Sequence, residues 1–110
     1  MQIQQMSDDY FVSGQIHPEH IDAIAKHGFK SVICNRPDGE AMGQPHSDHV
    51  LAAATKAGLE TRYIPITHGA LGLAEIERLQ EAIESMPGPI LAYCNSGARS
   101  AALFGIVSDY

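Results

Sequence analysis

One segment constrains this chain more than any other: a short apolar run leads directly into a cysteine, and an arginine follows after four intervening residues. The run covers residues 90–93, the cysteine is Cys94 and the arginine is Arg99. An apolar stretch over residues 101–107 comes next. This order predicts a strand, a loop and a helix, with the cysteine at the turn between strand and helix.

The chemistry of such a turn follows from its backbone. The loop aims several N–H groups and the positive end of a helix dipole at one point, which makes an anion-binding site. A cysteine at the edge of that site is expected to be a thiolate, because its pKa falls from about 8.5 into a lower range. Arg99 would hold an oxyanion with paired N–H donors. The sequence therefore predicts a cysteine-dependent enzyme.

Composition and charge narrow the class of protein. The 110 residues suit one domain, and 45% hydrophobic with 18% charged residues is typical of a globular chain. A formal charge of −6 argues against a nucleic-acid partner. No apolar run is long enough for a membrane span, and the first residues lack the features of a signal peptide. We expect a cytoplasmic protein without a membrane partner; its oligomeric state is left open.

Strand-like and helix-like segments alternate along the chain. Strands are predicted over residues 10–13, 30–34, 60–66 and 90–93, and helices over residues 18–27, 47–57, 73–86 and 100–107. The alternation predicts an α/β fold with a central, mostly parallel sheet flanked by helices. One domain should cover residues 10–110, after a flexible N-terminus over residues 1–9. In such sheets ligands bind at the carboxyl ends of strands, where Cys94 stands.

Four stretches of the chain resemble a known family; they are residues 12–16, 35–40, 43–45 and 92–100. The last is similar to the signature loop of the cysteine-phosphatase and rhodanese superfamilies. Together they resemble a bacterial phosphatase-like family of the protein tyrosine phosphatase superfamily, a domain also found fused to β-lactamase-fold hydrolases. The resemblance runs over residues 11–104. It implies a dual-specificity-phosphatase-like three-layer fold and hydrolysis of phosphate monoesters through a phosphocysteine on Cys94.

The predicted roles of the loop residues follow from this resemblance and from their chemistry. Cys94 is the nucleophile, Arg99 holds the oxyanion, and Ser100 is placed to hydrogen-bond the thiolate or to help a departing sulfur. The substrate anion is bound by the backbone of the four residues between them, which are Asn95, Ser96, Gly97 and Ala98. The expected partner is a small anionic substrate, either a phosphate ester or a sulfane-sulfur donor. No metal or organic cofactor is required.

Two departures from the phosphatase pattern leave a second reaction open. Phosphatases of this superfamily have a histidine before the cysteine and five residues between cysteine and arginine, whereas Tyr93 precedes Cys94 here and four residues intervene. Four is the rhodanese spacing, in which the cysteine carries a persulfide. Asn95, however, replaces the arginine that many rhodaneses place after the cysteine. A phosphatase is favoured, and a rhodanese-type sulfurtransferase or a non-catalytic anion-binding module are the alternatives.

The proton donor for a leaving group is less clear from the sequence. Cleavage of a phosphate ester needs an acid, usually a positioned aspartate. The loop before the third helix contains His68 and no carboxylate. Asp38 ends another strand, in a Pro-Asp-Gly sequence that also favours a simple turn. We predict Asp38 as a catalytic residue, with His68 and Arg36 at the substrate; Arg36 could instead anchor its own loop.

Two further features are given structural roles. Cys34 ends a strand as Cys94 does, so a reversible disulfide is conceivable, but a small buried side chain is the favoured interpretation. The histidine pairs at positions 17 and 20 and at 46 and 49 have ligand-like spacing. They lie at helix starts without a cysteine nearby, so no metal site is predicted.

Overall fold

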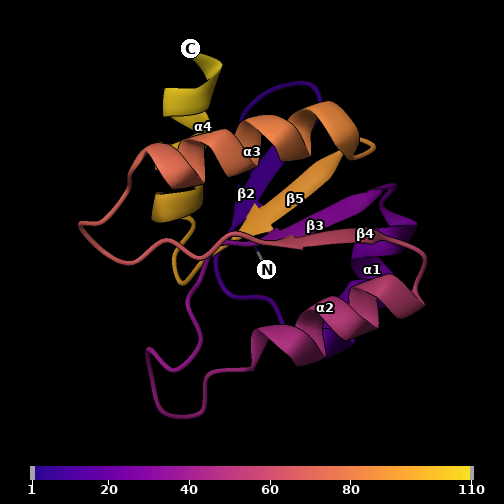
Figure 1. Ribbon diagram of the computed structural model, residues 1–110. Helices are drawn as coiled ribbons and strands as arrows, with labels where there is room; N and C mark the ends of the chain where they lie inside the picture. The colour runs from indigo at the N-terminus through magenta and orange to yellow at the C-terminus, as the bar shows by residue number, and fades with distance from the viewer. Residues whose placement is uncertain (1, 110) are drawn as a thin grey trace.

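A five-stranded sheet forms the middle layer of the computed structural model, which describes residues 2–109 (Figure 1). Its order is β1-β2-β5-β3-β4. The strands are β1 (Ile3–Gln5), β2 (Tyr10–Ser13), β3 (Ser31–Cys34), β4 (Glu60–Tyr63) and β5 (Ile90–Tyr93). β1 pairs antiparallel with β2, and the other pairs are parallel. Met1, which begins the predicted flexible N-terminus, and Tyr110, which ends the predicted domain, lie outside the described residues.

Helices cover both faces of this sheet. They are α1 (Ile21–Lys26), preceded by the short 3-10 helix η1 (Pro18–His20), α2 (Ser47–Lys56), α3 (Leu73–Ser85) and α4 (Ala98–Ser108). Figure 1 shows α3 and α4 on one face and α1 and α2 on the other. The predicted three-layer α/β fold is confirmed. Within residues 2–109, no helix has both the length and the apolar character needed to cross a membrane.

The central strands β3 and β5 divide the core into two halves. Their side chains alternate between the faces, as strand geometry requires. Ile33 and Ala92 pack with residues of α3 and α4, whereas Val32 and Leu91 pack with residues of α1 and α2. All four residues of β5 are buried. A strand covered on both sides explains why the segment before Cys94 is continuously apolar.

The structure differs from the predicted elements in three places. The strand predicted over residues 60–66 is shorter, since β4 ends at Tyr63. Residues 3–5, inside the predicted flexible N-terminus, form β1 and pair with residues 11–13 of β2. Two of these three residues are glutamines, so their pairing depends on the neighbouring strand and not on a local apolar pattern. The fourth helix begins at Ala98, so its first turn includes Arg99 and Ser100. The N-terminal turn of α4 is therefore part of the cysteine loop.

Two glycines allow the cysteine loop to lie close to the end of β2. Gly97 has φ +94°, and a Cβ there would come within 3.3 Å of the Ser13 backbone. A Cβ on Gly14 would lie 2.9 Å from the Asn95 carbonyl oxygen, which accepts a hydrogen bond from the Gln15 N–H over 3.1 Å. The loop after β5 thus rests on the loop after β2, and side chains at either glycine would separate them.

Candidate active site

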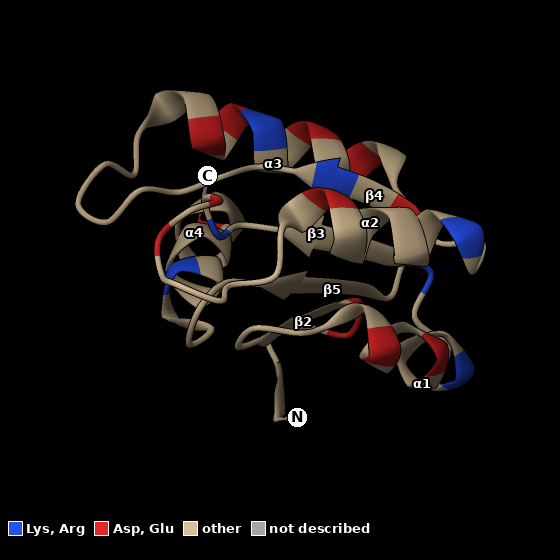
Figure 2. Cartoon of the chain, turned by 90° about the horizontal axis from the view of Figure 1, so that it is seen from below, with Lys and Arg blue, Asp and Glu red and all other residues tan. Residues whose placement is uncertain are grey.

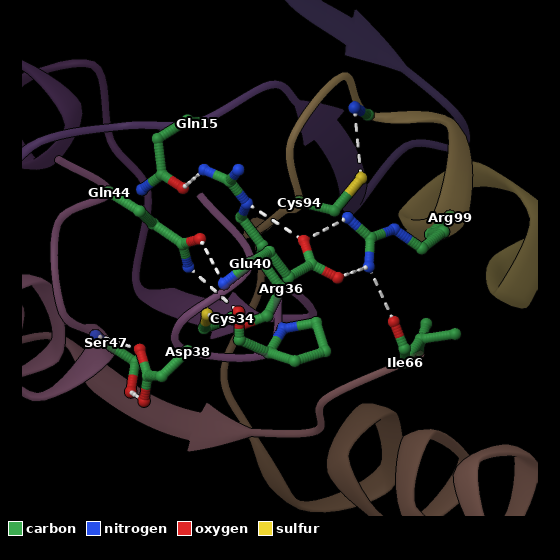
Figure 3. Close-up of polar contacts among 12 residues, drawn as sticks. Gln15, Cys34, Arg36, Asp38, Glu40, Gln44, Ser47, Ile66, Cys94 and Arg99 are labelled. Atoms are coloured by element: carbon green, nitrogen blue, oxygen red, sulfur yellow. Dashed lines mark hydrogen bonds and ion pairs between the residues drawn. The ribbon is translucent and has the colours of Figure 1, made fainter. Parts of the chain in front are cut away.

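Cys94 lies at the carboxyl end of β5, where its sulfur faces into its own loop. Its Sγ accepts a hydrogen bond from the Gly97 N–H over 3.0 Å (Figure 3). The residue is fully buried. Gly97 has a left-handed backbone conformation, with φ +94°, which lets the chain turn from the loop into α4 at a residue without a side chain. The predicted turn between strand and helix therefore places a backbone donor directly on the sulfur.

The surroundings of the sulfur favour its charged form. Burial by itself would raise the pKa of Cys94. Hydrogen bonds to the charged sulfur from the N–H and hydroxyl of Ser100 and from the N–H groups of Gly97 and Arg99 outweigh burial, so the pKa lies below its ordinary value. The N-cap and the first turn of α4 supply these donors, together with the positive end of the helix dipole. The predicted thiolate thus has a physical cause in the fold.

Arg99 is held from behind by a carboxylate that the sequence analysis did not single out. Glu40 accepts one hydrogen bond from Nη1 over 2.7 Å and one from Nη2 over 2.8 Å. The Ile66 carbonyl accepts a second hydrogen from Nη1, also over 2.7 Å. A guanidinium has five N–H groups. The Nε–H and the remaining Nη2–H, which share one edge, are used by neither Glu40 nor Ile66, so this edge is left for the Cys94 sulfur or a bound oxyanion.

A second arginine binds the same carboxylate. Arg36 donates from Nε to Glu40 over 3.1 Å and from Nη1 to Gln15 over 2.9 Å (Figure 3). The hydrogen bonds from Arg99, followed by those from Arg36, lower the pKa of Glu40 to about 2. Glu40 in turn raises the pKa of Arg99. The loop after β3 therefore holds the arginine of the cysteine loop, and Arg36 anchors that arrangement.

The positive charge of the site is local. Four glutamates but only one arginine lie on α3, and Figure 2 shows these acidic residues along that helix. With a formal charge of −6, the chain as a whole repels anions. An anion at Cys94 must therefore be attracted by Arg99, Arg36 and the N-terminus of α4. Because Glu40 already neutralises one of the two arginines, these groups match a single anionic group better than a polyanion.

Asp38, predicted as a catalytic acid, is engaged elsewhere. Its two carboxylate oxygens accept hydrogen bonds from the N–H and the hydroxyl of Ser47, each over 2.7 Å. Figure 3 shows this pair apart from Cys94. Although partial burial raises the pKa of Asp38, the hydrogen bonds from Ser47 outweigh that effect and lower it. An ionised carboxylate at the start of α2 has no proton to give, so this geometry favours the turn-forming interpretation.

His68 lies on the other predicted acid loop. The residue is exposed, two positions after Ile66, whose carbonyl binds Arg99. The loop contains a turn closed by a hydrogen bond from the Ala70 N–H to the Thr67 carbonyl. The loop that carries His68 therefore lies beside Arg99.

Cys34 and Cys94 are both free thiols. Cys34 is paired in register with Tyr93, so the two side chains share the face covered by α1 and α2. Cys94 is the next residue, and its sulfur is bound by the Gly97 N–H of its own loop. Burial raises the pKa of Cys34, and its thiol donates a hydrogen bond to the Arg36 carbonyl. The favoured interpretation of Cys34 as a buried side chain agrees with these contacts.

The four residues between Cys94 and Arg99 differ in their exposure to solvent. Asn95, Ser96 and Ala98 are exposed, whereas Gly97 is buried. The Ala98 N–H donates to the Ser96 hydroxyl over 3.3 Å. A cavity of about 920 Å³ lies against residues 95–98, between them and strands β1 and β2, but Cys94 and Arg99 do not line it. It therefore borders the loop on the side away from the two predicted catalytic side chains.

Besides Glu40, the sequence analysis missed Asn35. This fully buried residue donates from Nδ2 to the Ile64 carbonyl over 2.9 Å and accepts the Ser100 hydroxyl on Oδ1 over 2.8 Å. Both residues stand in the 35–40 stretch of the family resemblance. The spacing of Arg36 and Glu40, four residues apart with opposite charges, was the available signal for Glu40; Asn35 left none, since its partners are distant in sequence.

A sheet with this order and a cysteine loop between its central strand and a helix define a protein of the cysteine-phosphatase type of fold. Residues 2–109 match the family described as "Beta-lactamase hydrolase-like protein, phosphatase-like domain", and the chain belongs to that family. This agrees with the resemblance drawn from the sequence.

Relatives named beta-lactamase hydrolase-like protein occur in Xylella fastidiosa and Agrobacterium fabrum. The first is 34% identical over 106 residues, which are 96% of this chain and 25% of the relative. The second is 31% identical over 104 residues, 94% of this chain and 24% of the relative. The chain thus spans about a quarter of the length of the curated relatives it matches.

Solved structures of similar fold agree with this family assignment. A candidate phosphatase from Neisseria meningitidis matches with a TM-score of 0.87 and 30% identity, over 96% of this chain and 75% of that one. The catalytic core of a PP-IP phosphatase from S. cerevisiae matches with a TM-score of 0.74 and 15% identity, over 97% and 64% of the two chains. At that identity the second likeness shows the fold alone. Family and first structure support a phosphatase-type enzyme.

The ion pairs of Glu40 predict how stability depends on pH. Its pKa is about 2 in the folded protein, below the ordinary value of 4.5, so its contribution is complete above pH 4.5 and is lost as the pH falls towards 2. Glu40→Gln should lower the free energy of unfolding by about 2 kcal/mol at neutral pH, and the difference from wild type should shrink below pH 4.5. Urea unfolding at a series of pH values measures it.

The matched control is Glu77→Gln on α3, which removes one exposed carboxylate that forms no ion pair within residues 2–109. It should lower stability little at any pH. A Glu40→Gln difference that stays constant down to pH 2 would contradict the charge-based role of Glu40.

Proposed function

We propose that this chain is a cysteine-dependent phosphatase that hydrolyses phosphate monoesters through Cys94. The observation that carries the proposal is a sulfur with a lowered pKa beside an arginine whose Nε edge is open. A thiolate is the form in which cysteine attacks. The open edge of Arg99 and the N-terminus of α4 suit the oxygens of a phosphoryl group. Membership in a phosphatase-like family supports the same reaction type.

The proposed reaction has two steps. The Cys94 thiolate attacks phosphorus and the bond to the ester oxygen breaks, which leaves a phosphocysteine. The leaving oxygen takes a proton as it departs. Water then attacks the same phosphorus, the S–P bond breaks, and its electron pair returns to sulfur. Arg99 and the loop N–H groups stabilise the charge that builds on the phosphoryl oxygens in both transition states.

The proposed proton donor for the leaving oxygen is His68. Asp38 is bound by Ser47, and Glu40 has a pKa of about 2, so neither carboxylate keeps a proton at neutral pH. His68 lies on the loop whose Ile66 carbonyl binds Arg99. Histidine is a common general acid near neutral pH. We therefore prefer His68 over the Asp38 role expected from the sequence.

A sulfurtransferase is the second candidate, favoured by two observations. The loop has four residues between cysteine and arginine. The two carboxyl groups in the loop after β3 both have lowered pKa values, so neither is a proton donor. Transfer of a sulfane sulfur to Cys94 and then to a thiol acceptor needs no such donor. A non-catalytic anion-binding module is the remaining alternative.

The proposal concerns this domain alone. The relatives are about four times as long, so the activity of their remaining parts is not carried over to this chain. A small phosphorylated substrate is the proposed partner. The cytoplasmic location and the absence of a nucleic-acid partner stay predictions.

The pH dependence of kcat/KM tests the nucleophile. Because the thiolate is the reactive form, activity on p-nitrophenyl phosphate should be lost as the pH falls through the lowered pKa of Cys94. As the pH rises, kcat/KM should reach its plateau well below about pH 8.5, which is the pKa of a free thiol. Cys94→Ser should lower kcat/KM by roughly 10⁴-fold or more, whereas Cys34→Ala keeps the profile. A rate still rising near pH 8.5 would contradict an activated Cys94.

Two leaving groups separate the acid candidates. p-Nitrophenolate departs without a proton, whereas the phenolate of phenyl phosphate benefits from one. His68→Asn should therefore slow the hydrolysis of phenyl phosphate by roughly 10²-fold and that of p-nitrophenyl phosphate much less. Asp38→Asn should change both rates alike, since it weakens only the contacts of this carboxylate with Ser47 and His46. If Asp38→Asn instead shows the selective loss, the catalytic role expected from the sequence holds and His68 is excluded.

A further inference from the structure

Behind the cysteine loop, the hydroxyl of Ser100 has one hydrogen to donate and two acceptors that compete for it, Asn35 Oδ1 and the Cys94 sulfur. The Ser100 hydroxyl donates to Asn35 Oδ1 over 2.8 Å, and both residues are fully buried. Ser100 lies in the first turn of α4, and the N-cap of that helix, Gly97, donates its N–H to the Cys94 sulfur over 3.0 Å, so the hydroxyl belongs to the same turn that holds the sulfur. Although burial raises the pKa of Cys94, the hydroxyl is among the groups that lower it, in agreement with this position. A hydroxyl has a single hydrogen to donate. It cannot serve Asn35 and Cys94 at the same time.

The acceptor on Asn35 is fixed in place. Its Nδ2 donates to the Ile64 carbonyl, which can only accept, so Oδ1 must face Ser100 and the hydroxyl must be the donor. The main chain is equally held. The Asn35 N–H donates to the Tyr93 carbonyl over 2.7 Å, and its carbonyl accepts from the Ile66 N–H over 2.9 Å. Only the hydroxyl hydrogen of Ser100 is free to turn.

The charge on sulfur decides which acceptor receives the hydrogen. A hydrogen bond to a charged group is about twice as strong as one between neutral groups. A thiolate on Cys94 therefore competes well against the neutral amide oxygen of Asn35. A sulfur that carries a proton or a covalently bound group is a weak acceptor, and the hydroxyl then belongs to Asn35.

We propose that Asn35 is a positioning residue that holds the Ser100 hydrogen while the Cys94 sulfur is uncharged and yields it when the sulfur becomes a thiolate. The hydroxyl turns about its C–O bond; no covalent bond forms or breaks in this movement. As the bond from sulfur to the transferred group breaks, its electron pair stays on sulfur and the turning hydroxyl stabilises it. The inference rests on the proposed nucleophilic role of Cys94 but not on which group is transferred.

A double-mutant cycle tests the coupling. Asn35→Ala removes the competing acceptor, so the thiolate keeps the hydroxyl and the pKa of Cys94 should fall by roughly half a unit to one unit. Ser100→Ala should raise that pKa. In the Ser100→Ala background, Asn35→Ala should cause no further shift. The ultraviolet absorbance of the thiolate reports the titration, with the Cys94→Ser protein as the baseline that still contains Cys34.

Tyr93→Phe is the matched control, since it deletes another buried oxygen, that of the residue next to Cys94, which forms no hydrogen bond with Cys94, Ser100 or Asn35 within the described residues. It should leave the pKa of Cys94 unchanged. Equal shifts from Asn35→Ala in both backgrounds, or no shift in either, would overturn the inference.

A second measurement avoids the risk that Asn35→Ala does not fold. In the wild-type protein, the side-chain amide resonances of Asn35 should titrate with Cys94, and the amplitude should fall sharply in Ser100→Ala. An unchanged amplitude would overturn the inference. Neither titration uses a substrate, so a protein that titrates as expected but does not cleave phosphate esters contradicts the proposed function alone.

Discussion

The bidentate ion pair between Glu40 and Arg99 is the interaction on which the site depends. It joins residues 59 positions apart, one in the loop after β3 and one in the first turn of α4. Because the carboxylate takes one edge of the guanidinium, the Nε edge has a fixed direction. Arg99 without Glu40 would be a charged side chain with many conformations, and its buried charge would lack a counterion.

The fold places two kinds of support behind the reactive loop. Gly14 after β2 and Gly97 at the start of α4 let the two loops touch, and the N-terminus of α4 supplies N–H donors to the sulfur. Behind these groups, Glu40 orients the arginine and Asn35 orients the serine. Both belong to the loop that follows β3. One loop thus positions Arg99 and Ser100, two residues in the first turn of α4.

The sequence allowed the fold, the cysteine loop and the lowered pKa of Cys94 to be predicted, because each depends on a local pattern of apolar, glycine and basic residues. β1 was missed, since its glutamines carry no strand signal and it is held by β2. Asp38 could be assigned to a turn or to catalysis, and only its contact with Ser47 distinguishes them. The roles of Glu40 and Asn35 depend on partners far along the chain. The local spacing of Arg36 and Glu40 indicates an ion pair between these two residues, but it does not reveal Arg99.

The most direct test of the account is the covalent state of Cys94 during turnover. The protein is mixed with p-nitrophenyl phosphate and, separately, with glutathione persulfide, quenched rapidly, and its mass is measured with Cys94→Ser as the control. The account predicts one phosphoryl group on Cys94 with release of nitrophenol, and no stable sulfur adduct. A single added sulfur that a thiol acceptor removes, without any phosphoryl adduct, would contradict it and establish a sulfurtransferase on this fold.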